Sequence, residues 1–239
     1  MVDLFPGINV SETVTVLGDS TLLLPLSAAM AVLLWVRRSP AVALAWAVPL
    51  GLCLAGMAAL KVVGHACGME VLGTLVVSPS GHAAFGAAFY GTVGMMVGSR
   101  LRGWRRHLLL LAVAVVVVAV GITRVRLSAH SVPEVMIGLA IGTAAALAAI
   151  WALARVAVPQ GPRPVPAVTG PAMAVGLLAL PLLALVLSGH RLHVEDRIRD
   201  FALQLRDDAA VCTADRGAFD AQIAGRAAPG ELDNPSRLH

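Results

Sequence analysis

Six long apolar runs limit what this chain can fold into. They occupy residues 20–36, 41–63, 82–98, 107–122, 133–157 and 169–188. Most are close to the ~20 consecutive apolar residues that cross a bilayer core as a helix. Because a bilayer offers backbone amides no hydrogen-bond partner, continuous runs of this length favour helices. The sequence therefore predicts an all-α, polytopic membrane protein with six transmembrane helices packed in a bundle.

The composition of the chain agrees with this class. Apolar residues make up 58% of it, charged residues only 13%, and the mean hydropathy is +0.81, far from the average of soluble domains. The first twenty residues carry Asp3, Glu12 and Asp19 and no basic residue, so they do not resemble a cleaved signal peptide. We expect one membrane domain over residues 1–189 and a polar tail over residues 190–239.

The basic residues predict how the chain lies in the membrane. Eight arginines follow the first, third and fifth apolar runs: Arg37, Arg38, Arg100, Arg102, Arg105, Arg106, Arg155 and Arg163. The loops after the second and fourth runs hold only Lys61, Arg124 and Arg126. By the positive-inside rule the first set is cytoplasmic, so the second set and both termini are expected to be extracytoplasmic. The net charge of +4 thus comes from loops that flank the membrane, and no basic stripe with interleaved aromatic residues predicts nucleic-acid binding.

The tail differs in composition from the rest of the chain, since it holds nine of the fourteen acidic residues. Apolar residues recur in it at helical spacing: Val194, Ile198, Phe201, Leu205 and Cys212. We expect a short amphipathic helix that lies on the membrane surface or on the outer loops, with a lid over a site as the alternative.

The first chemically distinctive group combines Lys61 with the segment Ser80-Gly81-His82. Ser80 is suited to cap the helix of the third apolar run, and Gly81 lets a ligand approach the first free amides. A helix N-terminus beside an ammonium group is a suitable site for a phosphate. Each part also has a simpler interpretation: Lys61 as an anchor at the membrane interface, Ser80 as a cap alone, and His82 as a packed histidine.

The second group lies between the fourth and fifth apolar runs. Glu134 follows His130 by four residues, so a helical start places the carboxylate within reach of the imidazole and can fix its tautomer. Ser131 and Glu134 also form the pattern of a capping box at the start of the fifth run. Arg124 and Arg126 lie on the same predicted side of the membrane, and cationic groups near two histidines indicate an anion; for Arg126, simple snorkelling is the alternative.

Together these residues resemble the three signature motifs of the type 2 phosphatidic acid phosphatase superfamily, which includes bacterial lipid phosphate phosphatases. The matching segments are Lys61, Pro79-Ser80-Gly81-His82 and Arg124-x5-His130-x3-Glu134, within residues 41–150. The resemblance implies that His130 attacks phosphorus, His82 protonates the leaving oxygen and Glu134 orients the nucleophile. It also implies that the phosphate is held by Lys61, Ser80, Gly81 and Arg124.

The chain departs from the family pattern at two places. Gly68 and Met69 stand where the first motif has an arginine and a proline, so one phosphate clamp is missing. His65 and Arg126 are the candidates to replace it, and Arg126 is therefore counted with the phosphate-binding residues. Glu134 stands where the family has an aspartate, which moves the carboxylate by about one bond.

The expected activity is hydrolysis of a lipid phosphomonoester or diphosphate through a phosphohistidine, at the extracytoplasmic face of a bacterial inner (plasma) membrane. The expected partners are the phosphorylated lipid and the bilayer, with no metal and no cofactor; the sequence indicates no oligomeric state. A non-catalytic protein that binds lipid phosphates or acts as a scaffold is the main alternative. A transporter, an intramembrane serine protease and a vanadate-dependent peroxidase fit less well, and a transporter in particular would carry charges near the middle of its spans.

The three cysteines have different expected roles. Cys53 lies inside an apolar run and is expected in the core. Cys67 and Cys212 are both extracytoplasmic in the predicted topology, where a disulfide between them would hold the tail over the site.

Overall fold

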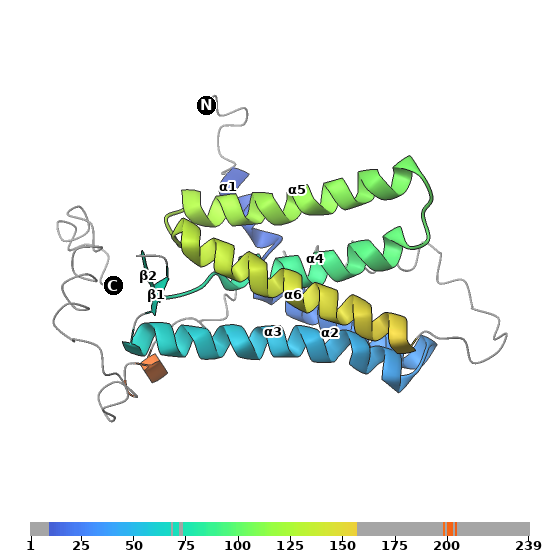
Figure 1. The fold of residues 1–239 in the computed structure, drawn as a ribbon, viewed down its shortest axis with the longest axis horizontal. Coiled ribbons are helices and arrows are strands. Elements are labelled where there is room, and N and C mark those ends of the chain that lie inside the picture. The colour runs from blue at the N-terminus through green and yellow to red at the C-terminus, as the bar shows by residue number, and fades with distance from the viewer. Residues whose placement is uncertain are drawn as a thin grey trace.

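The structure is a computed structural model, and it describes residues 10–67, 69–71 and 74–156, together with 198, 200–202 and 204 of the tail. Six helices and one hairpin follow one another along this part of the chain (Figure 1): α1 Val10–Val16, α2 Ser20–Arg37, α3 Pro40–Cys67, β1 Met69–Val71, β2 Thr74–Val76, α4 Gly81–Gly98, α5 Trp104–Arg126 and α6 Val132–Val156. The helices form a bundle, as the all-α prediction requires. The hairpin is a small departure from it.

Four stretches of the described chain are long and apolar enough to cross a membrane: Thr13–Arg37, Pro40–Cys67, Trp104–Arg126 and Val132–Val156. They indicate an integral membrane protein. α4 occupies the predicted run 82–98 but is not one of the four, because its five glycines and His82 dilute its apolar content. The run 169–188 lies outside the described residues, so the count of six spans stays a prediction.

The outer faces of the bundle are apolar. Leu52, Leu111 and Trp151 are 67%, 61% and 61% exposed. Large apolar side chains exposed on several helices at once are unusual for a soluble monomer and indicate a surface that is covered by something else. Lipid acyl chains are the covering that the four candidate spans imply.

α4 lies inside the bundle, between α5 and α6 (Figure 1). Ten of its eighteen residues are buried, against three of the 23 residues of α5. Two glycines of α6 permit its close approach: a Cβ atom at Gly138 would collide with the carbonyl oxygen of Ser80, and one at Gly142 would collide with that of Ala84. Small residues let helix backbones pack directly in a membrane, where van der Waals contact drives association. α6 is thereby fixed against the first turns of α4.

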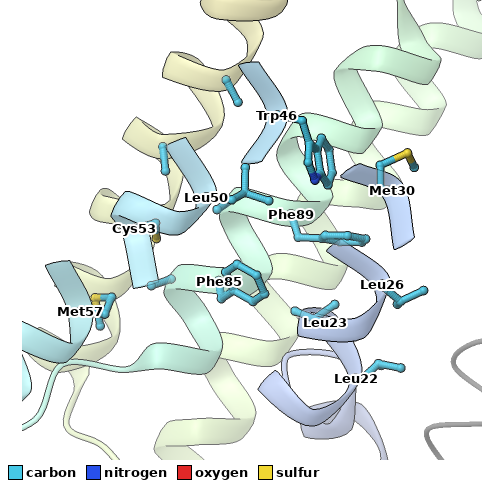
Figure 2. Packing of buried hydrophobic residues seen from close by; sticks show 14 of the residues in the cluster. Leu22, Leu23, Leu26, Met30, Trp46, Leu50, Cys53, Met57, Phe85 and Phe89 are labelled. Carbon is cyan, nitrogen blue, oxygen red and sulfur yellow. The ribbon is translucent and has the colours of Figure 1, made fainter. Parts of the chain in front are cut away.

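Bulky side chains of α2, α3 and α4 form the hydrophobic core (Figure 2). The rings of Trp46 and Phe89 meet edge to face with centroids 5.7 Å apart, and the indole nitrogen of Trp46 donates to the carbonyl oxygen of Ser27 at 3.1 Å. Leu50 is 2% exposed and Cys53 4%, so the prediction that Cys53 is a core residue is confirmed. This core fixes α2 and α3 relative to α4.

The helix directions create two chemically different ends. α3 and α5 finish, and α4 and α6 begin, at the end where the hairpin lies (Figure 1). The exposed arginines Arg37, Arg100, Arg102 and Arg155 lie at the opposite end. This separation agrees with the predicted charge bias of the loops. Which end faces the cytoplasm stays a prediction.

The hairpin and the tail lie at the margins of the fold. β1 and β2 pair antiparallel with Glu70 opposite Leu75, in a segment where the β-branched residues Val71 and Val76 favour strands. In the tail, the described residues 198, 200–202 and 204 are all helical, with Phe201 53% exposed and Ala202 buried. Two positions of the predicted amphipathic stripe, Ile198 and Phe201, are therefore described, and Val194, Leu205 and Cys212 lie outside the described residues.

Candidate active site

The first turn of α4 is built around Ser80, which is fully buried. Its side-chain oxygen accepts a hydrogen bond from the N–H of Ala83 at 3.5 Å, and its own N–H donates to the carbonyl oxygen of Glu134 at 3.0 Å. The prediction that Ser80 caps this helix is confirmed. The amides of Gly81 and His82 and the positive end of the helix dipole therefore lie at the hairpin end of the bundle.

Lys61 lies beside this turn. It belongs to α3 and is only 6% exposed. A Cβ atom added at Gly81 would be 3.8 Å from the Cε atom of Lys61, so the end of the lysine side chain reaches the start of α4. Such burial does not fit a lysine that anchors the helix from the surface. Lys61 and Gly81 are neighbours in space, as joint phosphate binding requires, and that role stays a prediction.

The end of α5 sets the position of His130 relative to Arg124. Ser128 has a left-handed backbone with a φ of 54°, and its N–H donates to the carbonyl oxygen of Val125 at 3.0 Å. The N–H of Ala129 donates to the carbonyl oxygen of Arg124 at 3.1 Å, which completes a Schellman motif. The N–H of His130 donates to the same oxygen at 3.2 Å. This tight turn folds His130 back against the last turn of α5.

The two arginines at the end of α5 face different ways. Both were expected in a loop, but α5 continues through them, because arginine is a good helix former and is favoured at the negative end of the helix dipole. Arg124 is half-buried, and its Nη1 atom donates to the side-chain oxygen of Thr15 in α1 at 3.3 Å. Arg126 lies about 200° further around the helix and is exposed. Arg124 thus lies with the cluster, and Arg126 is turned to another face.

Glu134 links the segment before α4 to the segment before α6. Its Oε1 atom accepts the N–H groups of Val77 at 3.0 Å and Ser78 at 3.2 Å, and its Oε2 atom accepts the N–H of Ser131 at 2.9 Å. Oε2 also lies 3.6 Å from Nδ1 of His130, and both side chains are 7% exposed. A carboxylate held by three amides beside an imidazole is suited to fix the imidazole tautomer.

Of the two hydrogen bonds of the predicted capping box, the one from the N–H of Ser131 to Glu134 is formed. Glu134 reaches the N–H of Ser131, but the side-chain oxygen of Ser131 is buried and has no hydrogen-bond partner within the described part of the chain. The same carboxylate also bonds to Val77 and Ser78. Glutamate serves both sets of donors because its extra methylene lengthens the arm, which gives a physical reason for glutamate where the family has aspartate.

His82, in the first turn of α4, lies near Asp19 at the start of α2. Its Nε2 atom is 3.7 Å from Oδ2 of Asp19, with the two side chains 25% and 34% exposed. The pKa of His82 is below its usual value, chiefly because burial disfavours the charged imidazole. Asp19 opposes this shift, and the charges of Arg124 and His130 add to it. His82 is therefore within electrostatic reach of both of these residues.

Sequence reasoning missed the contribution of the amino-terminal segment. Thr15 contacts Arg124, and Asp19 lies beside His82. A Cβ atom at Gly18 would lie 3.1 Å from the carbonyl oxygen of His82, so this segment packs closely on α4. The sequence does hold one signal: an acidic residue directly before the first apolar run, on the side of the membrane where the histidines are expected.

Further predictions concern metals and cysteines. Among the described residues, no group of three or more His, Cys, Asp or Glu side chains is placed to hold a metal ion. Cys67 is the last residue of α3 and is disulfide-bonded, whereas Cys53 is free. Cys212 lies outside the described residues, and its pairing with Cys67 stays a prediction.

Apolar spans together with imidazole, carboxylate and cationic groups at one end of a helix bundle define a class: integral membrane proteins with a polar site at the mouth of the bundle. Residues 70–157 match the model of the PAP2 superfamily. The matched region includes His82, Arg124, His130 and Glu134. The superfamily generally consists of phosphatases.

Among curated proteins, the chain is similar to an uncharacterised 22.5 kDa protein in the cps region of Klebsiella pneumoniae. The two are 31% identical over 134 residues, which make up 56% of this chain and 64% of that protein. The chain therefore spans less than two thirds of that relative. No solved structure matches the chain.

Proposed function

We propose that this protein is a membrane phosphatase that hydrolyses a lipid phosphomonoester or diphosphate through a phosphohistidine. The observation that carries the proposal is the convergence of three separate segments at one end of the bundle: Lys61, Ser80 to His82, and Arg124 to Glu134. Backbone hydrogen bonds and those of Glu134 hold the second and third segments together, and the side chain of Lys61 reaches the start of α4. The match of residues 70–157 to the PAP2 superfamily model supports the same class of activity.

The first chemical step assigns a role to each ring. His130 attacks phosphorus through Nε2, because its Nδ1 atom faces Glu134. An N–P bond forms while the P–O bond to the leaving group breaks, and protonated His82 gives its proton to the departing oxygen. The buried carboxylate of Glu134 stabilises the positive charge that His130 gains in this step.

The second step restores the protein. A water molecule attacks the phosphorus of the phosphohistidine, and its proton passes to His82, which has become neutral. The N–P bond breaks, and inorganic phosphate leaves. Lys61, Arg124 and the amides of the first turn of α4 are suited to stabilise the equatorial oxygens in both steps, since donors of fixed position are most effective where charge develops.

The substrate class follows from the position of this cluster. It lies at the mouth of a bundle whose outer faces are apolar, so a phosphate attached to a lipid can enter from the membrane surface while its acyl chains stay in the bilayer. Phosphatidic acid, phosphatidylglycerol phosphate and polyprenyl diphosphate all meet this requirement. We propose that the reaction takes place on the extracytoplasmic side, as the positions of the exposed arginines favour.

A phosphate-release panel with these three lipids tests the proposal. Purified wild-type protein in detergent micelles is expected to release phosphate, and His130→Ala is expected to lose about 10³-fold or more of this activity because the nucleophile is gone. The matched control is His107→Ala: His107 is an exposed histidine in the first turn of α5, at the opposite end of the bundle, and its loss should leave the activity unchanged.

The same proteins separate catalysis from binding. Wild-type protein incubated with ³²P-labelled lipid phosphate should carry an acid-labile label that His130→Ala lacks. Release of phosphate that is equal in wild type and His130→Ala would contradict the proposal. Tight binding of lipid phosphates without release would instead favour the scaffold alternative, in which the missing arginine of the first motif has ended catalysis.

A further inference from the structure

We infer that Asp19 is a positioning residue for the leaving-group acid: its carboxylate holds the Nε2–H of His82, so that Nδ1 carries the proton delivered to the departing oxygen. This inference rests on the proposed function. It deepens that function by adding a fourth segment, outside residues 70–157 of the superfamily match, to the site. Figure 1 shows α1 at the same end of the bundle as the start of α6.

The geometry that carries the inference is the approach of two side chains from separate elements. Oδ2 of Asp19 lies 3.7 Å from Nε2 of His82, which is within ion-pair distance though longer than a hydrogen bond. The other carboxylate oxygen, Oδ1, accepts the N–H of Thr21 at 2.8 Å. One oxygen is therefore fixed by the helix cap, and the second is left to face the imidazole.

The backbone around Asp19 is fixed by contacts with α4 and α5. The hydroxyl of Tyr90 in α4 donates to the carbonyl oxygen of Leu17 at 2.8 Å. A Cβ atom at Gly18 would meet the side chain of Val120 and the backbone of His82, so only glycine allows the segment to lie this close. Asp19 is thus held at a fixed position relative to His82 by packing on both sides.

His82 needs such a partner because its other neighbours disfavour the protonated form. Burial and the positive charge of Arg124 act against it, and His130 in the loop between α5 and α6 acts in the same direction. Asp19, between α1 and α2, is the group among the described residues that acts in favour of the imidazolium. Without its carboxylate, His82 would lose its proton at lower pH and would supply less acid for a poor leaving group.

The proton balance is the same as in the proposed reaction. The imidazolium of His82 carries one proton on each nitrogen, and Asp19 accepts a charge-assisted contact from Nε2–H. The Nδ1 proton moves to the leaving oxygen as the P–O bond breaks, which leaves neutral His82 with its remaining proton on Nε2 facing Asp19. In the second step Nδ1 accepts a proton from the attacking water.

Asp19→Asn is the informative variant, because asparagine is also a good helix cap and keeps an oxygen for the N–H of Thr21 while it removes the charge. Full-length wild type, Asp19→Asn, His82→Ala and the double variant are compared on two substrates. A short-chain phosphatidic acid has an alcohol as a poor leaving group, whereas p-nitrophenyl phosphate has a good one that needs little acid assistance. We expect Asp19→Asn to lower kcat on the lipid about 10- to 100-fold and on the aryl phosphate by less than about threefold.

The double variant should be no slower than His82→Ala alone, since Asp19 acts through His82. The alkaline limb of the pH profile of kcat/KM should move to lower pH in Asp19→Asn, because loss of a negative charge lowers the pKa of the acid. Equal losses on both substrates, or an additional loss in the double variant, would overturn the inference and make Asp19 a purely structural residue.

A second measurement does not depend on activity. NMR titration of the ring nitrogens of His82 in ¹⁵N-histidine-labelled protein should give a lower pKa in Asp19→Asn than in wild type; the same pKa in both would overturn the pairing. If wild type releases no phosphate in a His130-dependent way, the proposed function fails and the catalytic role of Asp19 fails with it. In that case the titration still decides whether the two side chains are paired.

Discussion

The two histidines of the site are held in very different ways. His130 and its partner Glu134 are each 7% exposed, and the carboxylate is fixed by three backbone amides. His82 and its partner Asp19 are 25% and 34% exposed, and their side chains are 3.7 Å apart. In the proposed reaction this difference has a reason. A nucleophile has to present one nitrogen in one tautomer, whereas an acid has to exchange protons with both the leaving group and water.

We call His130 with Glu134 the nucleophile half of the site and His82 with Asp19 the acid half. The two halves also differ in where their supporting residues come from. The partners of His130 all lie within residues 70–157, the region that matches the superfamily. The partner of His82 comes from the start of α2, which lies outside this region. His130 and Glu134 are therefore held by one continuous part of the chain, although the neighbouring Arg124 also contacts Thr15 of α1. His82, by contrast, takes its carboxylate partner from the amino-terminal segment.

Among the variants that test this comparison, Glu134→Gln is expected to lower activity most. Glutamine has the same shape, but one of its two terminal groups is a donor and would face an N–H group, either that of Ser131 or those of Val77 and Ser78. We expect kcat to fall about 10³-fold, by analogy with loss of the carboxylate that orients a catalytic histidine. Stability should fall by about 1–3 kcal/mol, because a buried donor loses its partner.

Phosphate release and thermal unfolding in micelles measure the two effects of Glu134→Gln separately. Asp19→Asn is the matched carboxylate-to-amide change in the acid half, and it should leave the unfolding temperature nearly unchanged because its cap is kept. If Glu134→Gln kept activity within about tenfold of wild type, the role assigned to Glu134 in orienting His130 would be wrong.

The arginines of α5 provide the next test, because only one of them lies with the nucleophile half. Arg124→Ala should lower kcat/KM about 10²-fold, since a donor to the developing phosphoryl charge is lost. Arg126→Ala should change it by less than about threefold, the size expected for a distant exposed charge that only steers the substrate. Equal losses in the two variants would show that Arg126 turns toward the phosphate when a lipid binds.

Gly81 lies between the two halves and tests where the phosphate rests. A methyl group at Gly81 would only touch the end of the Lys61 side chain, so Gly81→Ala should fold normally. The same methyl group stands where the proposed phosphate approaches the helix amides, and kcat/KM should fall about tenfold. Gly138→Ala is the matched control: its methyl group collides with the carbonyl oxygen of Ser80, so it should lower the unfolding temperature and the activity together. Normal activity of Gly81→Ala would place the phosphate elsewhere.

Much of the fold could be predicted from the sequence, because local patterns control it. Apolar runs gave five helices whose ends lie within a few residues of the expected ones, and the cap at Ser80 followed from its place before the run. The extension of α5 through Arg124 was missed, because a hydropathy pattern ends at the first charge whereas the helix continues through residues with good helix propensity.

The remaining features depend on contacts between distant parts of the chain. The position of α4 inside the bundle follows from glycines of α6 that fit against its backbone, which an apolar run does not reveal. The hydrogen bonds from the N–H groups of Val77 and Ser78 to Glu134 join the segment between the hairpin and α4 to the start of α6. The approach of Asp19 to His82 requires Gly18 to pack on α4. Motif spacing indicates which residues react, but not which residues hold them.

The smallest expected effect concerns the turn that positions His130. Ser128 has a φ of 54°, a conformation that costs a residue with a Cβ atom free energy and costs glycine little. Ser128→Gly should therefore stabilise the protein by about 0.5–1 kcal/mol and leave kcat unchanged, because the Schellman bonds to Val125 and Arg124 are made by backbone atoms. Ser128→Ala keeps the Cβ atom and should show no gain, which makes it the matched control. A lower unfolding temperature in Ser128→Gly would mean that the serine side chain itself holds the turn, and the rigidity of the nucleophile half would then depend on a side chain rather than on the backbone alone.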